Sequence, residues 1–258
     1  MNQTIEALLG RKSVRAYEDK AIPEEVREII LKAAMRAPTA GNQMLYSIIE
    51  VDSQESKDVL AVTCDNQPFI ARAPYVLLFL ADYQRWYDYF KAAGVPELCR
   101  QKGEEVRKPE EGDLFLACSD ALIAAHTAVT AAEAFGIGAC YIGDILENYE
   151  RHRELFDLPE YAFPIALVCF GYPTEQQKQR PQPERYKKEY VVYKDKYRRL
   201  SEEEFADMFR SSNEKLFGEK KSINGAENYG QHMYMRKFAG DFSREMSRSV
   251  REMLKNWK

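Results

Sequence analysis

The chain has 258 residues, of which 45% are hydrophobic and 12% aromatic, and its formal net charge is -4. A chain of this size can bury a full core as one large domain, with or without an appendage, and its slight acidity gives no support for nucleic acid as a partner. The five cysteines are scattered without a C-x-x-C pair, which argues against a disulfide framework or a zinc site and fits a reducing cytoplasm.

The first six residues include polar and acidic ones, so we expect no signal peptide. The longest apolar run, residues 75–81, is too short to cross a membrane. We therefore expect a cytoplasmic protein without a membrane partner.

Caps, breakers and apolar periodicity mark the predicted helices. Pro23 and the two glutamates after it open a helix with an apolar stripe at 3.6-residue spacing. That helix ends near residue 37, because Pro38 disfavours the helical conformation of the residue before it. Residues 113–135 are apolar on nearly all sides, which predicts a helix buried in a domain centre or at a subunit interface. Further helices are predicted at residues 57–63, 83–93 and 233–257. A short helix is predicted to end at residues 155–158, and another is predicted to start at residue 201.

Four apolar segments are predicted to be strands. Residues 74–81 show no polar alternation, which indicates a central strand buried on both faces. The other three strands are predicted at residues 47–51, 139–142 and 163–170. Residues 94–112 are polar and are expected to form a surface excursion. Helices and strands mix without strict alternation, which predicts an α+β fold, with one domain over residues 1–200 and a helical extension over 201–258.

Residues 11–17, RKSVRAY, carry a row of polar side chains. In an extended chain alternate residues share a face, so Arg11, Ser13 and Arg15 present guanidinium, hydroxyl and guanidinium side by side. Guanidinium groups are rigid forks of donors that suit phosphate or the acceptors of a ring. The row predicts a site for a ligand with a phosphate at one end and a ring at the other, and a solvated basic turn is the alternative.

Other catalytic motifs are missing from the sequence. The glycines at 136 and 138 lack the third glycine of a dinucleotide fingerprint and follow a helix instead of a strand. Of the three histidines, His126 is expected in the core, on the long helix, and His152 on a solvated helix turn. No metal site and no catalytic side chain are predicted, so difficult chemistry is expected to rest with a bound cofactor.

Four segments occur in the order seen in the nitroreductase family of FMN enzymes. They are Arg11-x-Ser13-x-Arg15, PTAGNQ at 38–43, GACYIG at 138–143 and KQR at 178–180. The chain most resembles the larger members, the NADPH-dependent oxygen-insensitive nitroreductases and flavin reductases. The resemblance implies a three-layer α+β fold, with a mostly antiparallel central sheet flanked by helices. It also implies an entwined homodimer with FMN at two interface sites, bound by the domain of residues 1–200.

The resemblance assigns site residues to parts of the FMN. The phosphate would be held by Arg11, Ser13, Lys178 and Arg180. The pyrimidine edge of the ring would be met by Arg15 and Gln67. The segment beside the ring, with a backbone N–H directed at N5, where the chemistry occurs, is Tyr141, Ile142, Gly143 and Asp144. The loop that contacts the FMN of the other subunit contains Pro38, Thr39, Ala40 and Asn42. Some larger members carry serines in this loop, so hydroxyl contacts at positions 40 and 41 are not expected here.

The activity implied is a ping-pong, two-electron transfer from NADPH or NADH to a nitroaromatic, a quinone or free flavin. One alternative is a related FMN enzyme with a dedicated small substrate, for ene or dehalogenating reduction. In that case residues 83–112 could form a lid, with a pocket walled by Trp86, Tyr87, Tyr89 and Phe90. The other alternative is a non-catalytic flavin-binding redox sensor.

Two features stay open at the level of sequence. The choice between NADPH and NADH is undecided, and candidate residues for the extra phosphate of NADPH are Arg210, Lys215, Lys220 and Lys221. The predicted C-terminal helix could wrap the partner subunit, because its apolar positions need a surface to cover. These positions are Met235, Phe238, Phe242, Met246, Val250 and Leu254.

Overall fold

The computed structural model describes residues 2–219 and 222–257. The chain forms two compact units: a core unit that runs to Gln182 and resumes at Glu245, and an arm unit from Pro183 to Arg244. This division differs from the boundary expected at residue 200, because the chain leaves the core unit earlier and its last helix rejoins it.

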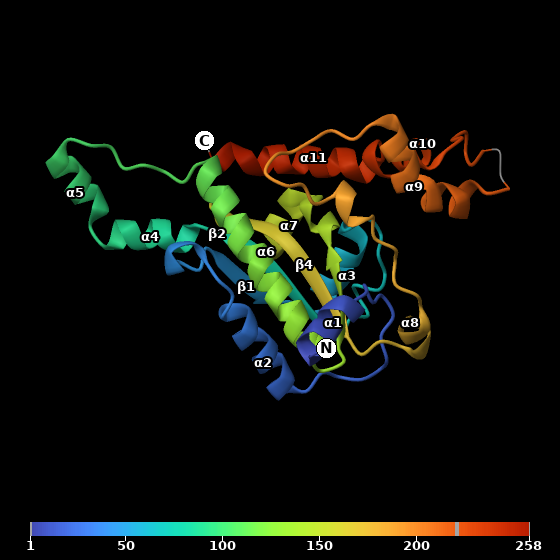
Figure 1. The fold of residues 1–258 in the computed structure, drawn as a ribbon. Coiled ribbons are helices and arrows are strands. Elements are labelled where there is room, and N and C mark those ends of the chain that lie inside the picture. The colour runs from blue at the N-terminus through green and yellow to red at the C-terminus, as the bar shows by residue number, and fades with distance from the viewer. Residues whose placement is uncertain (1, 220–221, 258) are drawn as a thin grey trace. The chain divides into compact units, whose positions relative to one another are not determined.

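The core unit is built on one four-stranded sheet in the order β1-β2-β4-β3 (Figure 1). The strands are β1 (Tyr46–Glu50), β2 (Tyr75–Asp82), β3 (Gly138–Ile142) and β4 (Ala162–Gly171). All three strand pairs are antiparallel, so the expected antiparallel sheet and α+β class are confirmed. Beyond the β3 edge, Ser13 makes an isolated parallel bridge to Ala139.

Alternation along β2 produces two cores and hence three layers. Leu77 and Phe79 pack with α2 (Glu24–Met35) and α6 (Glu111–Glu133) on one face of the sheet. Val76 and Leu78 pack with α3 (Gln54–Thr63) and η2 (Gly143–Leu146) on the other face. A strand buried on both faces needs apolar side chains at odd and even positions, which explains the unbroken apolar run. Around this sheet lie α1 (Gln3–Gly10), α7 (Tyr149–Leu155) and α8 (Glu175–Gln179).

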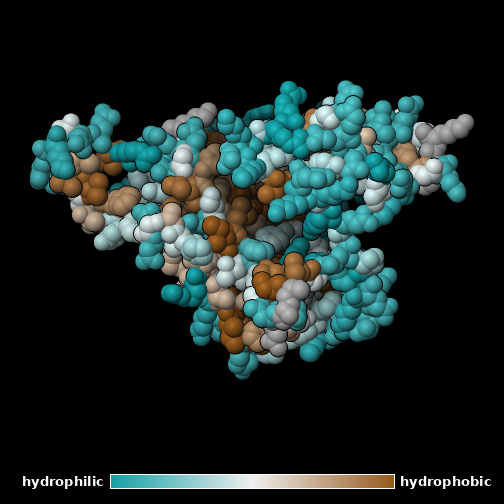
Figure 2. All heavy atoms as spheres, viewed as in Figure 1, coloured by the Kyte–Doolittle hydropathy of each residue, from teal (hydrophilic) through white to brown (hydrophobic). Residues whose placement is uncertain are grey.

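Helix α6 is buried on one side only. Alanines along it pack against α2 and the sheet, whereas Phe115 is 72% exposed and Ile123 is 41% exposed. Figure 2 shows apolar side chains gathered along the path of α6. By length and composition this helix could cross a membrane, but its packing on the sheet makes it a core helix.

The structure reverses the expectation for two histidines. His126 lies on the uncovered side of α6 and is exposed, so its predicted core position is wrong. His152, predicted to be solvated, is fully buried on α7. Only the packing of the neighbouring elements decides which side of each helix is covered.

Residues 83–112, which include the predicted surface excursion, contain two helices. The predicted aromatic helix is present as α4 (Gln84–Ala92), and a second helix, α5 (Val95–Lys102), follows where we expected irregular chain. Gly94 and Gly103 flank α5 with φ of 81° and 71°, a conformation that favours glycine. These glycines let the chain change direction at both ends of α5 (Figure 1).

The predicted helix over 233–257 is wrong as a single element. The arm unit contains η3 (Lys188–Tyr190), α9 (Glu202–Phe217), α10 (Tyr229–Met233) and the π-helical η4 (Tyr234–Phe238), and a break at Gly240 precedes α11 (Asp241–Met253) and η5 (Leu254–Asn256). Met253 and Trp257 are each 1% exposed, and the Trp257 ring stacks edge-on against Tyr161 at 5.4 Å. Val250 and Leu254, expected to cover a partner, pack on the core of their own chain.

Candidate functional site

The predicted row of residues 11–15 lies along the outer edge of β3. Val14 is buried and its backbone N donates to the Ala139 carbonyl at 3.0 Å. Ser13 and Arg15 alternate with it, so their side chains share the opposite side. The structure therefore places the predicted row beside the GACYIG segment, as the resemblance requires.

The late KQR segment closes on this row. The Arg180 guanidinium donates to the Ser13 carbonyl. Lys12 Nζ donates to the Lys178 carbonyl at 2.6 Å and to the carbonyl of Arg180. Three of the four predicted segments thus meet at one place, although residues 13 and 180 are 167 positions apart.

Arg11, Ser13 and residues 178–180 form a cluster that we call the Arg11 cluster. In this cluster the Nη1 donor of Arg11 is buried and has no hydrogen-bond partner in the described structure. Oε1 of nearby Glu133 is also buried without a partner, and burial raises the pKa of Glu133 to about 7 although the Arg11 charge lowers it. A buried cation without a partner is costly, so this corner fits an anion such as a phosphate.

Lys178 makes other contacts. Its ammonium pairs with Glu18 at 3.0 Å and with Glu175 at 2.7 Å. The backbone of the segment is therefore in the predicted place, but the Lys178 side chain would have to exchange these surface partners to meet a phosphate.

The ring end of the predicted site brings together segments far apart in sequence. Gln67 Nε2 donates to the Cys64 carbonyl at 2.9 Å and to Asp144 Oδ2 at 2.8 Å. Gly143 is exposed, and no atom lies within 4 Å of the place where a Cβ would be. The backbone there is open to a flat ligand. Ile142 is buried. Tyr141 is half-buried, and this burial raises the pKa of its hydroxyl to about 12.

Glu147, which the sequence analysis missed, lies next to this end. It is 6% exposed, and its Oε1 has no hydrogen-bond partner in the described residues. Burial, together with the charges of Asp144, Asp65 and Glu245, raises the pKa of Glu147 to about 7. No sequence signal indicated this, because a glutamate before a short helix is usually solvated.

We expect Glu147→Gln to stabilise the protein above pH 7 and to have little effect at pH 4.5. The folded pKa lies above the ordinary value, so the folded state holds a proton that the unfolded state loses between pH 4.5 and 7. Stability therefore falls as pH rises through this window. The amide removes that loss, and the gain at pH 8 is about 1–3 kcal/mol.

Urea unfolding at pH 4.5 and pH 8 measures this effect. Glu154→Gln, on an exposed side chain of α7, is the control and should show no such gain. Equal stability of Glu147→Gln and wild type at pH 8 would contradict the assignment.

His152 links the elements behind the ring end. Its Nδ1 lies 3.0 Å from the Ile145 carbonyl and its Nε2 lies 2.8 Å from Thr63 Oγ1. Burial lowers the pKa of His152. Nδ1 donates to the Ile145 carbonyl, which can only accept, and Nε2 pairs with the Thr63 hydroxyl, which also donates to the Val59 carbonyl at 3.0 Å. The contact joins α7 to the end of α3, just before the Gln67 loop.

The loop at 38–43 is held by Asp120 of α6. The buried Asp120 carboxylate accepts from Thr39 Oγ1, from Ala40 N at 3.0 Å and from Leu45 N at 3.1 Å. Gly41 and Asn42 have φ of 55° and 57°, and Pro38, Gly41 and Asn42 are exposed. Asp120 was missed as well, although a lone carboxylate in an alanine-rich stripe was a usable signal.

One chain does not bring this loop to the other predicted residues. Ile142 is in register with Leu167, Leu167 with Leu78, and Leu78 with Ile49. The β1 edge is therefore three strand spacings, about 14 Å, from β3. Asp120 and Glu133 are thirteen residues apart on α6, or about 20 Å along the helix axis. The loop and the Arg11 cluster thus lie at separate places on the core unit.

Residues 83–112 contact the loop at 38–43 and also line a separate cavity. Trp86 Nε1 donates to the Gln43 carbonyl at 2.8 Å. Tyr87 and Phe90 line a cavity of about 330 Å³ between α4, α5 and residues 104–109, whereas Tyr89 is exposed. The four aromatic residues proposed as pocket walls therefore have three different environments.

The NADPH candidates lie in the arm unit. Arg210 pairs with Asp207 at 2.9 Å, and Lys215 pairs with Glu184. Lys220 and Lys221 lie outside the described residues.

Comparisons with known proteins give matches over most of the chain. The family model described as "Nitroreductase family" matches residues 8–172. A Bacillus subtilis (strain 168) protein named FMN reductase [NAD(P)H] is 30% identical over 257 residues, which cover 98% of this chain and 96% of that protein. A second from the same strain, FMN reductase (NADPH), is 30% identical over 199 residues, 76% of this chain and 75% of its own length. The solved structure of a Bacteroides fragilis NCTC 9343 protein described as an oxidoreductase has 27% identity and a TM-score of 0.83, with 98% of each chain covered.

Proposed function

The chain belongs to the nitroreductase family, and on that premise we propose that it is an FMN-dependent oxidoreductase that uses NADPH or NADH to reduce a small-molecule acceptor. The observation that carries the proposal is the buried Nη1 donor of Arg11, which has no hydrogen-bond partner among the described residues and lies in the segment that Arg180 contacts at Ser13. The cluster offers an unused donor on a positive charge at the position where the family resemblance puts the FMN phosphate.

The predicted site residues of the core unit would divide the FMN between them. Arg11, Ser13 and Arg180 would hold the phosphate, and Arg15 and Gln67 would meet the pyrimidine edge of the ring. Gly143 leaves the backbone open for close approach, and Asp144 holds the Gln67 amide in place. Bound FMN would supply two-electron transfer from a reduced nicotinamide to a second substrate. The protein would supply binding and orientation.

The acceptor would be a nitroaromatic, a quinone or free flavin, and donor and acceptor would use the same face in turn. The excursion cavity supports a second candidate function, a dedicated small substrate, because Tyr87 and Phe90 could wall a pocket. A panel of acceptors separates the two: comparable turnover of quinones and nitroaromatics supports the broad reductase, and turnover confined to one small enone or halide supports the other.

A visible spectrum of the purified protein, followed by anaerobic titration with NADPH, tests the main proposal. Flavin bands that bleach with about one equivalent of NADPH per subunit are expected for two-electron transfer. No flavin after reconstitution with FMN would overturn the proposal. The free thiols of the described chain support placing the enzyme in the reducing cytoplasm.

We also propose a homodimer in which a second copy completes the site. The loop at 38–43 and the Arg11 cluster lie apart in one chain, so a loop from the partner would complete each cluster. The uncovered side of α6 supplies an apolar surface, with Phe115, Leu116, Leu122 and Ile123 all at least 41% exposed. Such a helical stripe is typical of a subunit interface.

We expect the double change Phe115→Asp and Ile123→Asp to convert the dimer to monomers and to reduce FMN retention. Two carboxylates in an apolar interface would lose their water without gaining partners. Sedimentation velocity measures the mass, and Val62→Asp on exposed α3 surface is the matched control. A double variant that stays dimeric would show that the α6 stripe is not the interface.

A further inference from the structure

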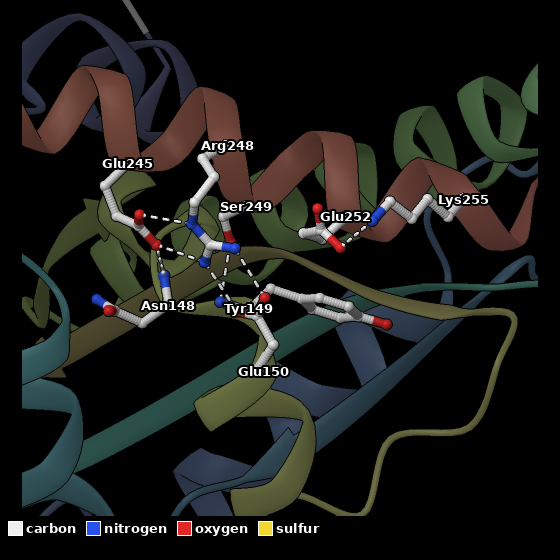
Figure 3. A network of polar contacts seen from close by, with 8 residues as sticks. All are labelled: Asn148, Tyr149, Glu150, Glu245, Arg248, Ser249, Glu252 and Lys255. Atoms are coloured by element: carbon white, nitrogen blue, oxygen red, sulfur yellow. Dashed lines mark hydrogen bonds and ion pairs between the residues drawn. The ribbon is translucent and has the colours of Figure 1, made fainter.

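The C-terminal helix α11 contacts the segment that follows the ring end of the site. From this contact we infer that Arg248 and Ser249 are positioning residues for residues 143–148, an inference that rests on the proposed FMN function. Figure 3 shows the side chains involved, which come from α11 and from the start of α7.

The start of α7 is capped by α11 and not by its own residues. The first backbone amides of a helix have no partner within the helix, and Asn148, at φ of 50°, makes no side-chain cap. Asn148 N donates to Glu245 Oε1 at 3.1 Å, and Tyr149 N donates to Ser249 Oγ at 2.9 Å (Figure 3). These partners are 97 and 100 residues apart in the chain, and Ser249 is fully buried.

Arg248 holds this cap in place. Its guanidinium donates to both carboxylate oxygens of Glu150, at 2.7 and 2.8 Å, and to both of Glu245, at 2.8 Å each. The fork geometry of arginine allows two such paired contacts, which lysine cannot reproduce. The hydrogen bond to Arg248 also lowers the pKa of Glu150 to about 2. Without Arg248, the carboxylates of Glu150 and Glu245 would lose the cation that pairs with both of them, and Glu245 would keep its repulsion with Glu150 and Glu147.

The cap connects directly to the ring end. Glu147 N donates to the Asp144 carbonyl at 3.0 Å, so Asn148 follows immediately on the turn that carries Gly143 and Asp144. Asn148 Nδ2 donates to the Thr63 carbonyl at 2.8 Å, which ties the same turn to α3 and the Gln67 loop. A displacement of Asn148 would therefore move both segments that are proposed to meet the ring.

Helix α11 is itself anchored. Met253 and Trp257 are buried in the core near Tyr149 and Tyr161. A helix held in this way can fix the position of Asn148 to within the tolerance that a cofactor site needs. The buried side of α11 thus serves the site through backbone capping, without touching the ligand.

The test compares Arg248→Ala and Ser249→Ala with Lys255→Ala. Lys255 lies seven residues beyond Arg248 and pairs with Glu252 at 2.5 Å (Figure 3). It makes no hydrogen bond or ion pair to α7 in the described contacts, and its charge is only a minor cause of the low pKa of Glu150. We measure FMN dissociation constants by quenching of flavin fluorescence, and hydrogen exchange at the amides of residues 143–148. Arg248→Ala is expected to weaken FMN binding about tenfold and to speed exchange, Arg248→Lys to have an intermediate effect, and Lys255→Ala to change binding less than about twofold.

Ile30→Val on α2 distinguishes a positioning role of Arg248 from a general loss of stability. Ile30 is fully buried in the other core, so this variant loses stability without touching α7 and should keep wild-type FMN affinity. If Arg248→Ala and Ser249→Ala bind FMN and exchange like Lys255→Ala, the inference is wrong. If wild-type protein binds no FMN, the proposed function fails instead, and exchange in the FMN-free variants still tests the cap. Should Arg248→Ala not fold, Arg248→Lys and Ser249→Ala provide the same comparison.

Discussion

Arg11→Ala is expected to weaken FMN binding about 100-fold, or ~3 kcal/mol, because it removes a buried charge from a phosphate contact. The buried Nη1 atom has no other partner in the described structure, so its contribution should come almost entirely from the ligand. The FMN-free protein should lose little stability, since an unpaired buried cation is unfavourable. Without the Arg11 charge, the pKa of Glu133 should rise further. Titration of FMN-free protein with FMN, followed by fluorescence, measures the loss.

Arg151→Ala is the matched control, because Arg151 is an exposed arginine paired only with Glu154 in the described contacts. It should bind FMN like wild type. Arg11→Lys should recover part of the affinity, since an ammonium keeps the charge but loses the fork. Wild-type affinity in Arg11→Ala would remove the Arg11 cluster from the site and would require another location for the phosphate.

Asp120→Ala should cost about 3 kcal/mol of folding free energy, because it leaves three donors without their shared acceptor in a buried place. Those donors are Thr39 Oγ1, Ala40 N and Leu45 N. For a chain of this size the melting temperature should fall by roughly 6–12 °C. The loop at 38–43 should also lose its conformation, because positive φ at Asn42 needs support from its surroundings.

Differential scanning calorimetry measures the loss, and Ser119→Ala serves as its neighbour control. Ser119 is exposed and its hydroxyl donates only to the Phe115 carbonyl of its own helix in the described contacts, so that variant should melt like wild type. The melting temperature of Asp120→Asn should fall between those of Asp120→Ala and Ser119→Ala, since an amide keeps one acceptor but places a donor against another donor. An unchanged melting temperature in Asp120→Ala would show that the loop is held by other contacts, such as the one from Trp86 to the Gln43 carbonyl.

Most elements of the core unit could be predicted from local sequence. Pro23, Pro38 and Gly136 mark helix ends through backbone geometry that depends on no distant residue. The unbroken apolar run of β2 indicated a strand buried on both faces, and β2 lies at the sheet centre. Helix α5 is an exception in the core unit, because it lies in a polar segment with weak apolar periodicity. In the arm unit the break at Gly240 was missed, because apolar positions continue at helical spacing across it.

The candidate site was predicted in part, for the same reason. Alternation placed Ser13 and Arg15 on one side of an extended chain, and the structure lays that chain beside β3. The roles of Asp120, Glu147 and His152 depend on partners brought in by folding, such as Thr63, 89 residues from His152. Local periodicity carries no information about such pairs.

Local sequence was enough to predict most of the element pattern, the α+β class and the row of donors, because dihedral preferences and side-chain alternation act over a few residues. The uncovered side of α6, the identity of the buried histidine and the capping of α7 by α11 follow from the tertiary structure alone. Burial and capping depend on which surfaces meet, and the free energy of that choice is spread over contacts far apart in the chain.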